Sequence, residues 1–456
     1  MHYDLVVIGA GPGGHAVAEN ASRLGARVAI VEKDKWGGVC THCGCIPTKA
    51  LLACSRRYTE TRKLKRMGIS INGISADFPM MKRHQQQMVK VSALGVRETL
   101  EDAGVERKEG EGFILSPGEV EVVSSDDTKD HLQTKNIVIA WGSEPAVIPG
   151  IEISGRILNS RDFLALEKLP RSAIIVGGGA IGVEFATFMA ELGVKVTIVE
   201  LMNQVLPTEE KDAAQLLTGE LKKIDIDIYT STSMKSLTDT GDGVMLRSTH
   251  KNQTQEIVAE NALICAGRKP LLRNEELDRL SIQYNRKGIV VDDYQMTNID
   301  NIFAIGDVTG GILLAHRAMA QGRAVASNLF GDCSVKCREE IIPSVVYTHP
   351  NVARVGLTEE KALEQGLKIK VERVGYGGNI IARTELMGNG FVKTLFSDGR
   401  LIGVTIVGDK ASELIAPMSM AVANGMGKRE LQNWIIPHPT LSELLRPAPF
   451  LTKDCE

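Results

Sequence analysis

The sequence predicts an α/β protein in which one strand–helix–strand module occurs twice. An apolar run rich in Val and Ile leads into a glycine-rich turn and an Ala-rich helical stretch, and a second apolar run then ends in glutamate. The same order returns 168 residues later (177 − 9 = 168). A chain of 456 residues also has room for about two to four domains of ordinary size.

The composition excludes several kinds of partner. No apolar run approaches the ~20 residues of a membrane helix, and 53 basic against 56 acidic residues give a net charge too balanced to favour nucleic acid. A strand-like run begins at Tyr3, which leaves no room for a signal sequence, and eight cysteines are too few for a secreted disulfide scaffold. We therefore expect a cytoplasmic protein with no membrane segment.

The first module has the pattern of a Rossmann-like, dinucleotide-binding turn. The predicted strand 5–8 is followed by the turn Gly-Ala-Gly-Pro-Gly-Gly. In such a turn Gly9 permits the tight bend, Gly11 lets the backbone approach a pyrophosphate, and Gly14 lets helix and strand pack closely. Glu32 ends the next predicted strand, where a carboxylate suits the diol of a ribose.

The second module repeats this pattern in register. Gly177, Gly179 and Gly182 occupy the same places in the turn, and Glu200 ends the following strand as Glu32 does (200 − 32 = 168). One such turn alone is weak evidence, but two in register predict that the chain binds two dinucleotides. Glu200 would repel a 2′-phosphate, and no arginine occurs in residues 201–206, so the second site should prefer NAD over NADP.

Three cysteines are grouped between the two modules. They lie in residues 37–49, GGVCTHCGCIPTK, immediately before a helix-like run. The start of a helix and the neighbouring Lys49 both favour a thiolate, the form of cysteine that attacks disulfides. The cluster therefore predicts redox-active thiol chemistry.

With these motifs the chain resembles the pyridine nucleotide–disulfide oxidoreductases, whose pattern Gly-Gly-x-Cys-x-x-x-x-Cys-x-Pro-x-Lys is met by residues 37–49. The resemblance covers nearly the whole chain. It implies two Rossmann-like dinucleotide-binding domains, one for FAD and one for NAD, plus a C-terminal α+β dimerisation domain. The implied division is an FAD-binding domain with the redox cysteines at 1–147, an NAD-binding domain at 148–268, a return to the FAD or central domain at 269–336, and the dimerisation domain with a catalytic histidine at 337–456.

The resemblance also implies the catalytic residues. Cys40 and Cys45 would form the active disulfide, with Cys40 exchanging with substrate and Cys45 lying against the flavin. His438 would be the base that deprotonates the incoming dithiol, held and made more basic by Glu443. Because this histidine would reach the site of the other subunit, a homodimer would be obligatory for catalysis.

Further cofactor-binding residues are implied in the same way. Lys49 would lie near the flavin and pair with Glu184, and Asp307 would meet the ribityl chain. No metal ligand is implied. In addition to the glycines and glutamates of the two turns, the implied cofactor-binding residues are Lys49, Gly112, Gly142, Glu184, Gly267, Asp307 and Ala315.

Within the family, the chain is most similar to the enzymes that oxidise dihydrolipoyl groups, because Glu200 argues against the NADPH-dependent reductases and residues 438–443 match. The implied reaction passes electrons from a lipoyl-carrying protein or a small dithiol through the cysteine pair and FAD to NAD. Three other functions remain open. They are NADH-dependent reduction of another disulfide substrate, a non-enzymatic thiol redox sensor, and a structural subunit of a multienzyme complex.

Cys43 departs from the family pattern, since a non-thiol residue is usual there. An inert small residue is the favoured interpretation. A Cys40–Cys43 pair that rearranges the disulfide is one alternative, and zinc binding by Cys40, His42, Cys43 and Cys45 is another, although zinc would block the flavin chemistry.

Four other positions also depart from the family pattern. Trp141 replaces an expected threonine, Gln321 a glutamate, and Ile436-Pro437 a His-Ala pair. We therefore expect altered packing around the nucleotide and an altered substrate mouth. Cys455 is interpreted as incidental, because relatives with a mobile C-terminal thiol generally have a pair.

Overall fold

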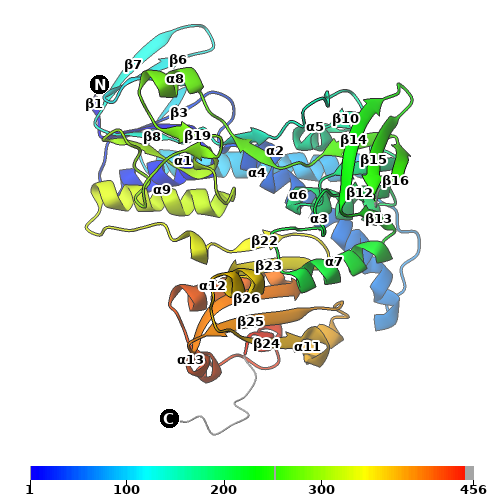
Figure 1. The fold of residues 1–456 in the computed structure, drawn as a ribbon. Coiled ribbons are helices and arrows are strands. Elements are labelled where there is room, and N and C mark those ends of the chain that lie inside the picture. The colour runs from blue at the N-terminus through cyan, green and yellow to red at the C-terminus, as the bar shows by residue number, and fades with distance from the viewer. Residues whose placement is uncertain (1, 251–252, 447–456) are drawn as a thin grey trace. The chain divides into compact units, whose positions relative to one another are not determined.

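The computed structural model describes residues 2–250 and 253–446 (Figure 1). The chain forms two compact units, each assembled from separate segments. The first comprises 1–50, 80–147 and 267–339, and the second comprises 51–79, 148–266 and 340–456. The division into four domains expected from the sequence remains a prediction, and Cys455 lies outside the described residues.

The first unit is built on a five-stranded parallel sheet in the order β21-β8-β2-β3-β4. All four residues of its central strand, β2, are buried, as the continuous apolar run requires of a strand covered on both faces. The strands are β2 (Leu5–Ile8), β3 (Val28–Glu32), β4 (Glu106–Glu109), β8 (Ile137–Ile139) and β21 (Ile302–Ala304).

Alternate residues of β2 face two different cores. Val6 and Ile8 belong to one buried cluster, and Leu5 and Val7 belong to another that also includes α1 residues. Strand geometry requires this, because successive side chains point to opposite faces. The dinucleotide turn that follows β2 is therefore anchored from both sides.

Helices α1 (Pro12–Arg23) and α9 (Ala315–Phe330) lie side by side on this sheet (Figure 1). Their close approach depends on glycine, since a Cβ atom at Gly322 would lie 2.7 Å from the carbonyl oxygen of Gly13. Helix α9 thus packs against the first strand–helix–strand module although it comes much later in the chain.

Smaller elements complete the first unit. β1 (His2–Tyr3), β5 (Glu111–Ser116), β6 (Glu119–Val123) and β7 (Lys129–Thr134) form a second sheet, and two short ribbons pair β9 with β18 and β19 with β20. The remaining elements are α2 (Gly38–Cys43), α3 (Cys45–Glu60), which continues into the second unit, α4 (Phe78–Asp102), β9 (Ser143–Pro145), β18 (Arg268–Pro270), α8 (Asn274–Arg279), β19 (Tyr284–Asn285), β20 (Gly288–Ile289) and the 3₁₀ turn η2 (Gly306–Thr309).

The second unit contains a parallel sheet of the same kind, in the order β10-β17-β11-β12-β13. A three-stranded antiparallel sheet of β14, β15 and β16 packs with it through a shared apolar cluster. The elements are η1 (Thr61–Met67), β10 (Ile157–Leu158), α5 (Ser160–Ala165), β11 (Ser172–Val176), α6 (Ala180–Glu191), β12 (Lys195–Val199), α7 (Lys211–Lys223), β13 (Ile226–Tyr229), β14 (Thr232–Asp239), β15 (Val244–His250), β16 (Gln253–Ala259) and β17 (Asn261–Ile264).

The C-terminal part of the second unit is an antiparallel sheet in the order β22-β23-β26-β25-β24, on which α12 packs. This agrees with the α+β character expected of it. The elements are η3 (Glu339–Ile341), β22 (Ser344–Val346), β23 (Asn351–Gly356), α10 (Glu359–Glu364), β24 (Lys370–Gly375), η4 (Tyr376–Gly378), α11 (Ile380–Thr384), β25 (Phe391–Ser397), β26 (Arg400–Gly408), α12 (Ala411–Ala423), α13 (Lys428–Asn433) and η5 (Leu441–Leu445).

The fold class is thus confirmed as α/β with two Rossmann-like sheets and a C-terminal α+β part. Within residues 2–250 and 253–446, no helix combines the length and the apolar character needed to cross a bilayer.

Candidate active site

The first glycine turn forms a tight cradle between β2 and α1. Gly9 has φ +108°, and a Cβ there would lie 2.3 Å from the carbonyl oxygen of Ala140. A Cβ at Gly14 would lie only 1.8 Å from the carbonyl oxygen of Gly9. Both positions therefore require glycine, and the first turn of α1 rests directly on the end of the strand.

The second turn reproduces this geometry in the other unit. Gly177 also has φ +108°, and a Cβ would lie 2.4 Å from the carbonyl oxygen of Cys265. At Gly182 it would lie 2.0 Å from the carbonyl oxygen of Gly177. Gly11 and Gly179, which precede α1 and α6, adopt nearly the same extended conformation.

Each turn is fastened by the glutamate at the end of the second strand. Glu32 Oε2 accepts the N–H of Ala10 at 2.7 Å, and Glu200 Oε2 accepts the N–H of Gly178 at 2.5 Å. Glu200 Oε1 also accepts the N–H of Met202 at 2.6 Å. These carboxylates fix the loop at which a nucleotide ribose is expected and place negative charge there.

The two turns fit the pyrophosphate of a dinucleotide. A Cβ added at Gly11 or at Gly179 would meet no atom within 4 Å, so open space lies in front of the backbone at the N-terminus of each helix. N–H groups and the helix dipole favour an anion there. The positions that demand glycine for packing and those that leave space for phosphate are therefore the ones that the pattern predicted.

Asp307 lies in η2, where its Oδ2 accepts a hydrogen bond from the Ser143 hydroxyl at 2.5 Å. The Arg268 guanidinium donates to the same hydroxyl at 2.8 Å and to the Ser143 carbonyl at 2.6 Å. The antiparallel pairing of β9 with β18 brings Arg268 to Ser143. Asp307 is thus held at a defined place in the first unit, as a flavin contact would require.

Gly142 and Gly267 flank that strand pair, both with positive φ. The Gly142 carbonyl accepts the N–H of Leu271, and the Gly267 carbonyl accepts the N–H of Ala146. Ala315 is the first residue of α9. All three lie in the first unit, and their contact with a cofactor remains a prediction.

Gln321 on α9 is almost fully buried and has a structural role. Its Oε1 accepts the N–H of Gly306 at 2.7 Å, and its Nε2 donates to Gln295 at 2.8 Å. The amide, unlike the glutamate usual in the family, can both accept and donate without a buried charge. It therefore fixes the residue immediately before Asp307.

Trp141 packs against Arg273, whose guanidinium lies 4.9 Å from the indole centroid. Arg273 also donates to the carbonyl of Gly112, the residue in β5 that was expected to bind cofactor. The indole Nε1 is buried and has no hydrogen-bond partner among the described residues. Trp141 thus makes a tryptophan–arginine contact, and its effect on the packing around a nucleotide stays a prediction.

The redox cysteines lie where two helices meet. Cys40 and Cys43 are on α2, and Cys45 begins α3; all three side chains are partly exposed and none is in a disulfide. The cluster is joined to the first dinucleotide turn, because Gly37 N–H donates to the Ala10 carbonyl at 3.0 Å. The sequence-predicted cysteines and the first glycine turn are therefore neighbours in one unit.

Cys40 is hydrogen-bonded to Cys45. This neighbour, followed by burial, raises the pKa of the Cys40 thiol above its usual range, and Lys49 only partly offsets the shift. The Cys45 neighbour and burial therefore oppose, at Cys40, the thiolate that the helix start and Lys49 favour. Two adjacent thiols do not both ionise readily.

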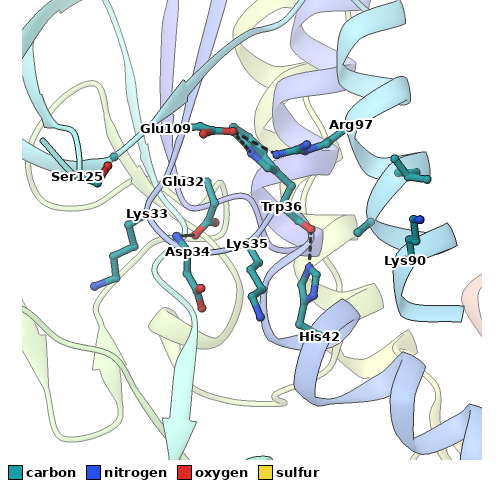
Figure 2. A pocket seen from close by; sticks show the side chains of 13 residues that line it. Glu32, Lys33, Asp34, Lys35, Trp36, His42, Lys90, Arg97, Glu109 and Ser125 are labelled. Atoms are coloured by element: carbon teal, nitrogen blue, oxygen red, sulfur yellow. Dashed lines mark hydrogen bonds and ion pairs between the residues drawn. The ribbon is translucent and has the colours of Figure 1, made fainter. Parts of the chain in front are cut away.

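A cavity of about 450 Å³ lies beside this cluster, between the loop after β3 and helix α4 (Figure 2). His42 Nε2 lies 3.0 Å from the Trp36 carbonyl oxygen, to which it can only donate, and the Trp36 indole donates to Glu109 at 3.2 Å. Because Glu32 also lines the cavity, the cavity fits the adenosine end of a dinucleotide bound at the first turn.

Zinc binding by the cluster has no support. In the part of the chain that the structure describes, no group of three or more His, Cys, Asp or Glu residues is arranged to hold a metal ion.

His438 and Glu443 lie at the C-terminal end of the second unit. Nδ1 of His438 lies 3.0 Å from Glu443 Oε1, and the other carboxylate oxygen accepts the N–H of Thr440 at 3.1 Å. The imidazole is largely exposed. Because Nδ1 donates to the carboxylate, Nε2 is the nitrogen left to accept a proton.

Lys49 and Glu184 lie in different units, and their pairing remains a prediction. Within the second unit, Glu184 on α6 is buried and accepts the N–H of Tyr347 at 2.9 Å. Further along α6, Oε1 of Glu191 lies 2.5 Å from Nδ1 of His349. The segment 347–349 therefore holds α6 at two points.

Sequence reasoning did not assign Ser143, Arg268, Tyr347 or His349 to the site. Ser143 and Arg268 directly follow Gly142 and Gly267, so their signal was adjacency to predicted cofactor-binding residues. The partners of all four residues could not be read from the sequence, because the contacts join residues 125 or more positions apart.

Comparison with known families gives two matches. Residues 3–322 match the pyridine nucleotide-disulphide oxidoreductase model, and residues 342–449 match the dimerisation domain of the same family.

Relatives match over nearly the whole length. The chain is 37% identical to a dihydrolipoyl dehydrogenase of Chlorobaculum parvum over 453 residues, covering 98% of this chain and 96% of the relative. It is 35% identical to a dihydrolipoyl dehydrogenase of Bacillus subtilis, covering 98% and 95%.

Two solved structures are similar to the whole chain. LpdA from Mycobacterium tuberculosis gives a TM-score of 0.90 at 28% identity, covering 97% of this chain and 98% of that one. The HOCl-induced flavoprotein disulfide reductase RclA from Escherichia coli, solved as a Cu(II) complex, gives 0.86 at 28% identity, covering 98% of both chains.

Proposed function

The chain belongs to the pyridine nucleotide-disulphide oxidoreductase family, as a dihydrolipoyl dehydrogenase-like enzyme with FAD and NAD as cofactors, and we propose that its substrate is a dihydrolipoyl dithiol. The observation that carries the proposal is the contact of Cys40 with Cys45 at the start of α3, in the same unit as the first dinucleotide turn. We assign FAD to the turn at Gly9 and NAD to the turn at Gly177.

The thiol chemistry needs only the residues of the cluster and one base. A substrate thiolate attacks Cys40 Sγ of the Cys40–Cys45 disulfide and releases Cys45 as a thiolate. The second substrate thiol then attacks the substrate sulfur of the mixed disulfide, which closes the substrate disulfide and releases Cys40. The turn at Gly9 would hold FAD and the turn at Gly177 would hold NAD, and these cofactors would supply the flavin that accepts the electron pair of the dithiol and the nicotinamide that accepts hydride.

His438 is the proposed base. Glu443 accepts from Nδ1, so Nε2 is the free acceptor and can take the proton of the attacking thiol. A base is needed because a thiol, unlike a thiolate, is a poor nucleophile.

The dimerisation domain supports a homodimer. We propose that His438 of one subunit serves the cysteine pair of its partner, that the substrate is presented by a lipoyl-carrying protein or as a small dithiol, and that the enzyme works in the cytoplasm. The compartment rests on the sparse cysteines, which suit a reducing environment.

A second candidate is NADH-dependent reduction of another disulfide. It is favoured by Cys43, a third free thiol in the cluster, and by the structural similarity to a protein described as a disulfide reductase. A non-enzymatic redox sensor is less well supported, because a sensor does not need the His438–Glu443 pair.

The test is NADH formation by the purified, FAD-loaded protein supplied with dihydrolipoamide and NAD, compared with a Cys45→Ser variant. Rapid turnover that the substitution abolishes is expected. Absence of turnover in the unmodified protein, with flavin still reducible by NADH, would favour the second candidate.

A further inference from the structure

We infer that Cys43 is a second resolving thiol, able to exchange with Cys40, so that the cluster forms two alternative disulfides, Cys40–Cys45 and Cys40–Cys43. The inference rests on Cys40 as the exchanging thiol of the proposed function. It adds a residue to that site for which the reaction with dihydrolipoyl groups has no need.

The first observation is the position of Cys43 on α2. Cys40 and Cys43 are three residues apart on this helix, which ends at Cys43. Residues at this spacing lie on one face of a helix, with Cβ atoms about 5–6 Å apart. Both side chains are partly exposed and both are free thiols.

The second observation is how the chain turns between the two helices. A Cβ at Gly44 would lie 3.0 Å from the Val39 carbonyl oxygen and 3.4 Å from Cys40 Cα. Gly44 therefore folds back onto the residue that exchanges with substrate. Cys43 and Cys45 are its two neighbours in the chain, so both thiols are carried by residues next to this contact.

The remaining distance is small enough for exchange. A disulfide needs Cβ atoms about 3.5–4.5 Å apart, roughly 1–2 Å closer than a regular helix gives. Cys43 is the last residue of α2 and is followed by glycine, which is where a helix loosens most easily. A movement of this size at the end of the helix closes the gap.

The two disulfides are not equivalent. Cys45 begins the 16-residue helix α3, whose positive N-terminal dipole favours a thiolate leaving group at Cys45. Cys43 precedes that helix and gains less from it. Cys40–Cys45 is therefore the ordinary disulfide. The Cys40–Cys43 disulfide forms where Cys43, in place of Cys45, attacks Cys40.

The exchange is balanced without an external oxidant. If Cys40 carries a substrate sulfur in a mixed disulfide, Cys43 loses its proton to solvent or a base and attacks Cys40 Sγ. The Cys40–Cys43 bond forms, the bond from Cys40 to the substrate sulfur breaks, and the substrate leaves as a thiolate. Cys43 is oxidised by one electron equivalent, Cys40 stays in a disulfide, and the substrate sulfur is reduced. Such a step suits a disulfide substrate that has no second thiol of its own.

The test compares Cys45→Ser with the matched double variant Cys43→Ser/Cys45→Ser, both full-length and FAD-loaded. Each is reduced, freed of reductant and treated with one equivalent of 5,5′-dithiobis(2-nitrobenzoate). Released thionitrobenzoate is measured, and trypsin then yields the peptide 36–49, which contains the whole cluster. Retained flavin and thermal unfolding verify that both variants are folded, and Cys45→Ala serves as a second variant.

We expect Cys45→Ser to release two thionitrobenzoates per cluster and to give a peptide two hydrogens lighter, with Cys40 joined to Cys43. The double variant should release one and retain the adduct on Cys40. An adduct that persists in both variants overturns the role of Cys43 alone. If Cys40 forms no adduct even in the double variant, Cys40 is not the exchanging thiol, and the proposed function fails with the inference.

Discussion

The contact between His438 and Glu443 shows how one side chain orients another. The carboxylate lies 3.0 Å from Nδ1 and also caps η5 through the N–H of Thr440. The hydrogen bond from His438, followed by that from Thr440, lowers the pKa of the Glu443 carboxyl. The hydrogen bond between His438 and Glu443 is therefore fully present at pH values above the ordinary carboxyl pKa. It is lost only as the pH falls through the lowered pKa of Glu443.

We predict that His438→Gln lowers kcat/KM for dihydrolipoamide by about 10²–10⁴-fold, because glutamine cannot accept the thiol proton. Glu443→Gln should lower it by roughly tenfold, since the imidazole remains but its orientation is no longer fixed by a carboxylate. Steady-state kinetics at pH 7 checks both. Flavin content and Tm are the controls, and a His438→Gln enzyme with unchanged kcat/KM would remove His438 from the mechanism.

At the scale of elements, the strand–turn–helix units separate packing glycines from binding glycines. At Gly182 a Cβ would lie 2.0 Å from the Gly177 carbonyl oxygen, whereas at Gly179 it would meet nothing within 4 Å. The first position joins helix to strand, and the second leaves space for a ligand. Equivalent substitutions at these two positions should therefore have different consequences.

We predict that Gly179→Ala leaves Tm nearly unchanged and raises KM for NAD by roughly tenfold or more, because the methyl group occupies the path of the pyrophosphate. Gly182→Ala should instead lower Tm, since backbone must move to admit the Cβ. Thermal unfolding and NAD kinetics on both variants test this. Equal loss of stability in the two would contradict the distinction between packing and binding.

A second element-scale feature is the cluster of charges around Lys393 on β25. Its ammonium lies 3.1 Å from Glu210, which immediately precedes α7, and 2.6 Å from Glu359 on α10, and the side chain is buried. Burial lowers the pKa of Lys393, but the carboxylates of Glu359 and Glu210 raise it further and prevail. The start of α7 is thus tied to the C-terminal sheet within the second unit.

Lys393→Met should destabilise the protein by about 3–5 kcal/mol, because it leaves the buried carboxylate of Glu210 without its cation. Since the pKa is raised, the stabilisation is complete below the ordinary lysine value and is lost only above it, so the difference should persist from neutral pH to about pH 10. The exposed Lys223–Glu220 pair is the control, and Lys223→Met should change stability by less than about 1 kcal/mol. Denaturant unfolding measures both, and equal effects would contradict the role of burial.

At the scale of the whole molecule, the proposed catalysis needs two subunits. The family match assigns a dimerisation domain to residues 342–449, which include His438, whereas the cysteine pair belongs to the first unit. If each active site combines the cysteines of one subunit with the histidine of its partner, two variants that are inactive alone can complement each other.

We predict that co-expressed Cys45→Ser and His438→Gln chains recover about a quarter of the unmodified activity. Random pairing makes about half of the dimers mixed, and each mixed dimer has one intact site of two. Mixed dimers isolated with two affinity tags should retain about half. If both residues of a site came from one chain, mixed dimers would be inactive.

Much of the site was readable from the sequence because its requirements are local. The glycines at 9, 14, 177 and 182 were identified from spacing alone, since a strand that turns sharply into a helix admits no Cβ at those points. The cysteine spacing and the acidic strand ends were equally local. These features established two dinucleotide turns and a redox cluster before any contact was known.

Other features depended on tertiary packing. Ser143 joins Asp307 to Arg268 across 164 and 125 residues, and the Cys45 neighbour together with burial raises the pKa of the Cys40 thiol. A side chain's partner and its pKa depend on what the fold brings within a few ångströms and on how much water it excludes, and neither is encoded at one position. The sequence by itself therefore determined the fold class, the two nucleotide turns and the identity of the thiols, and the tertiary structure decided how those thiols and carboxylates are held and charged.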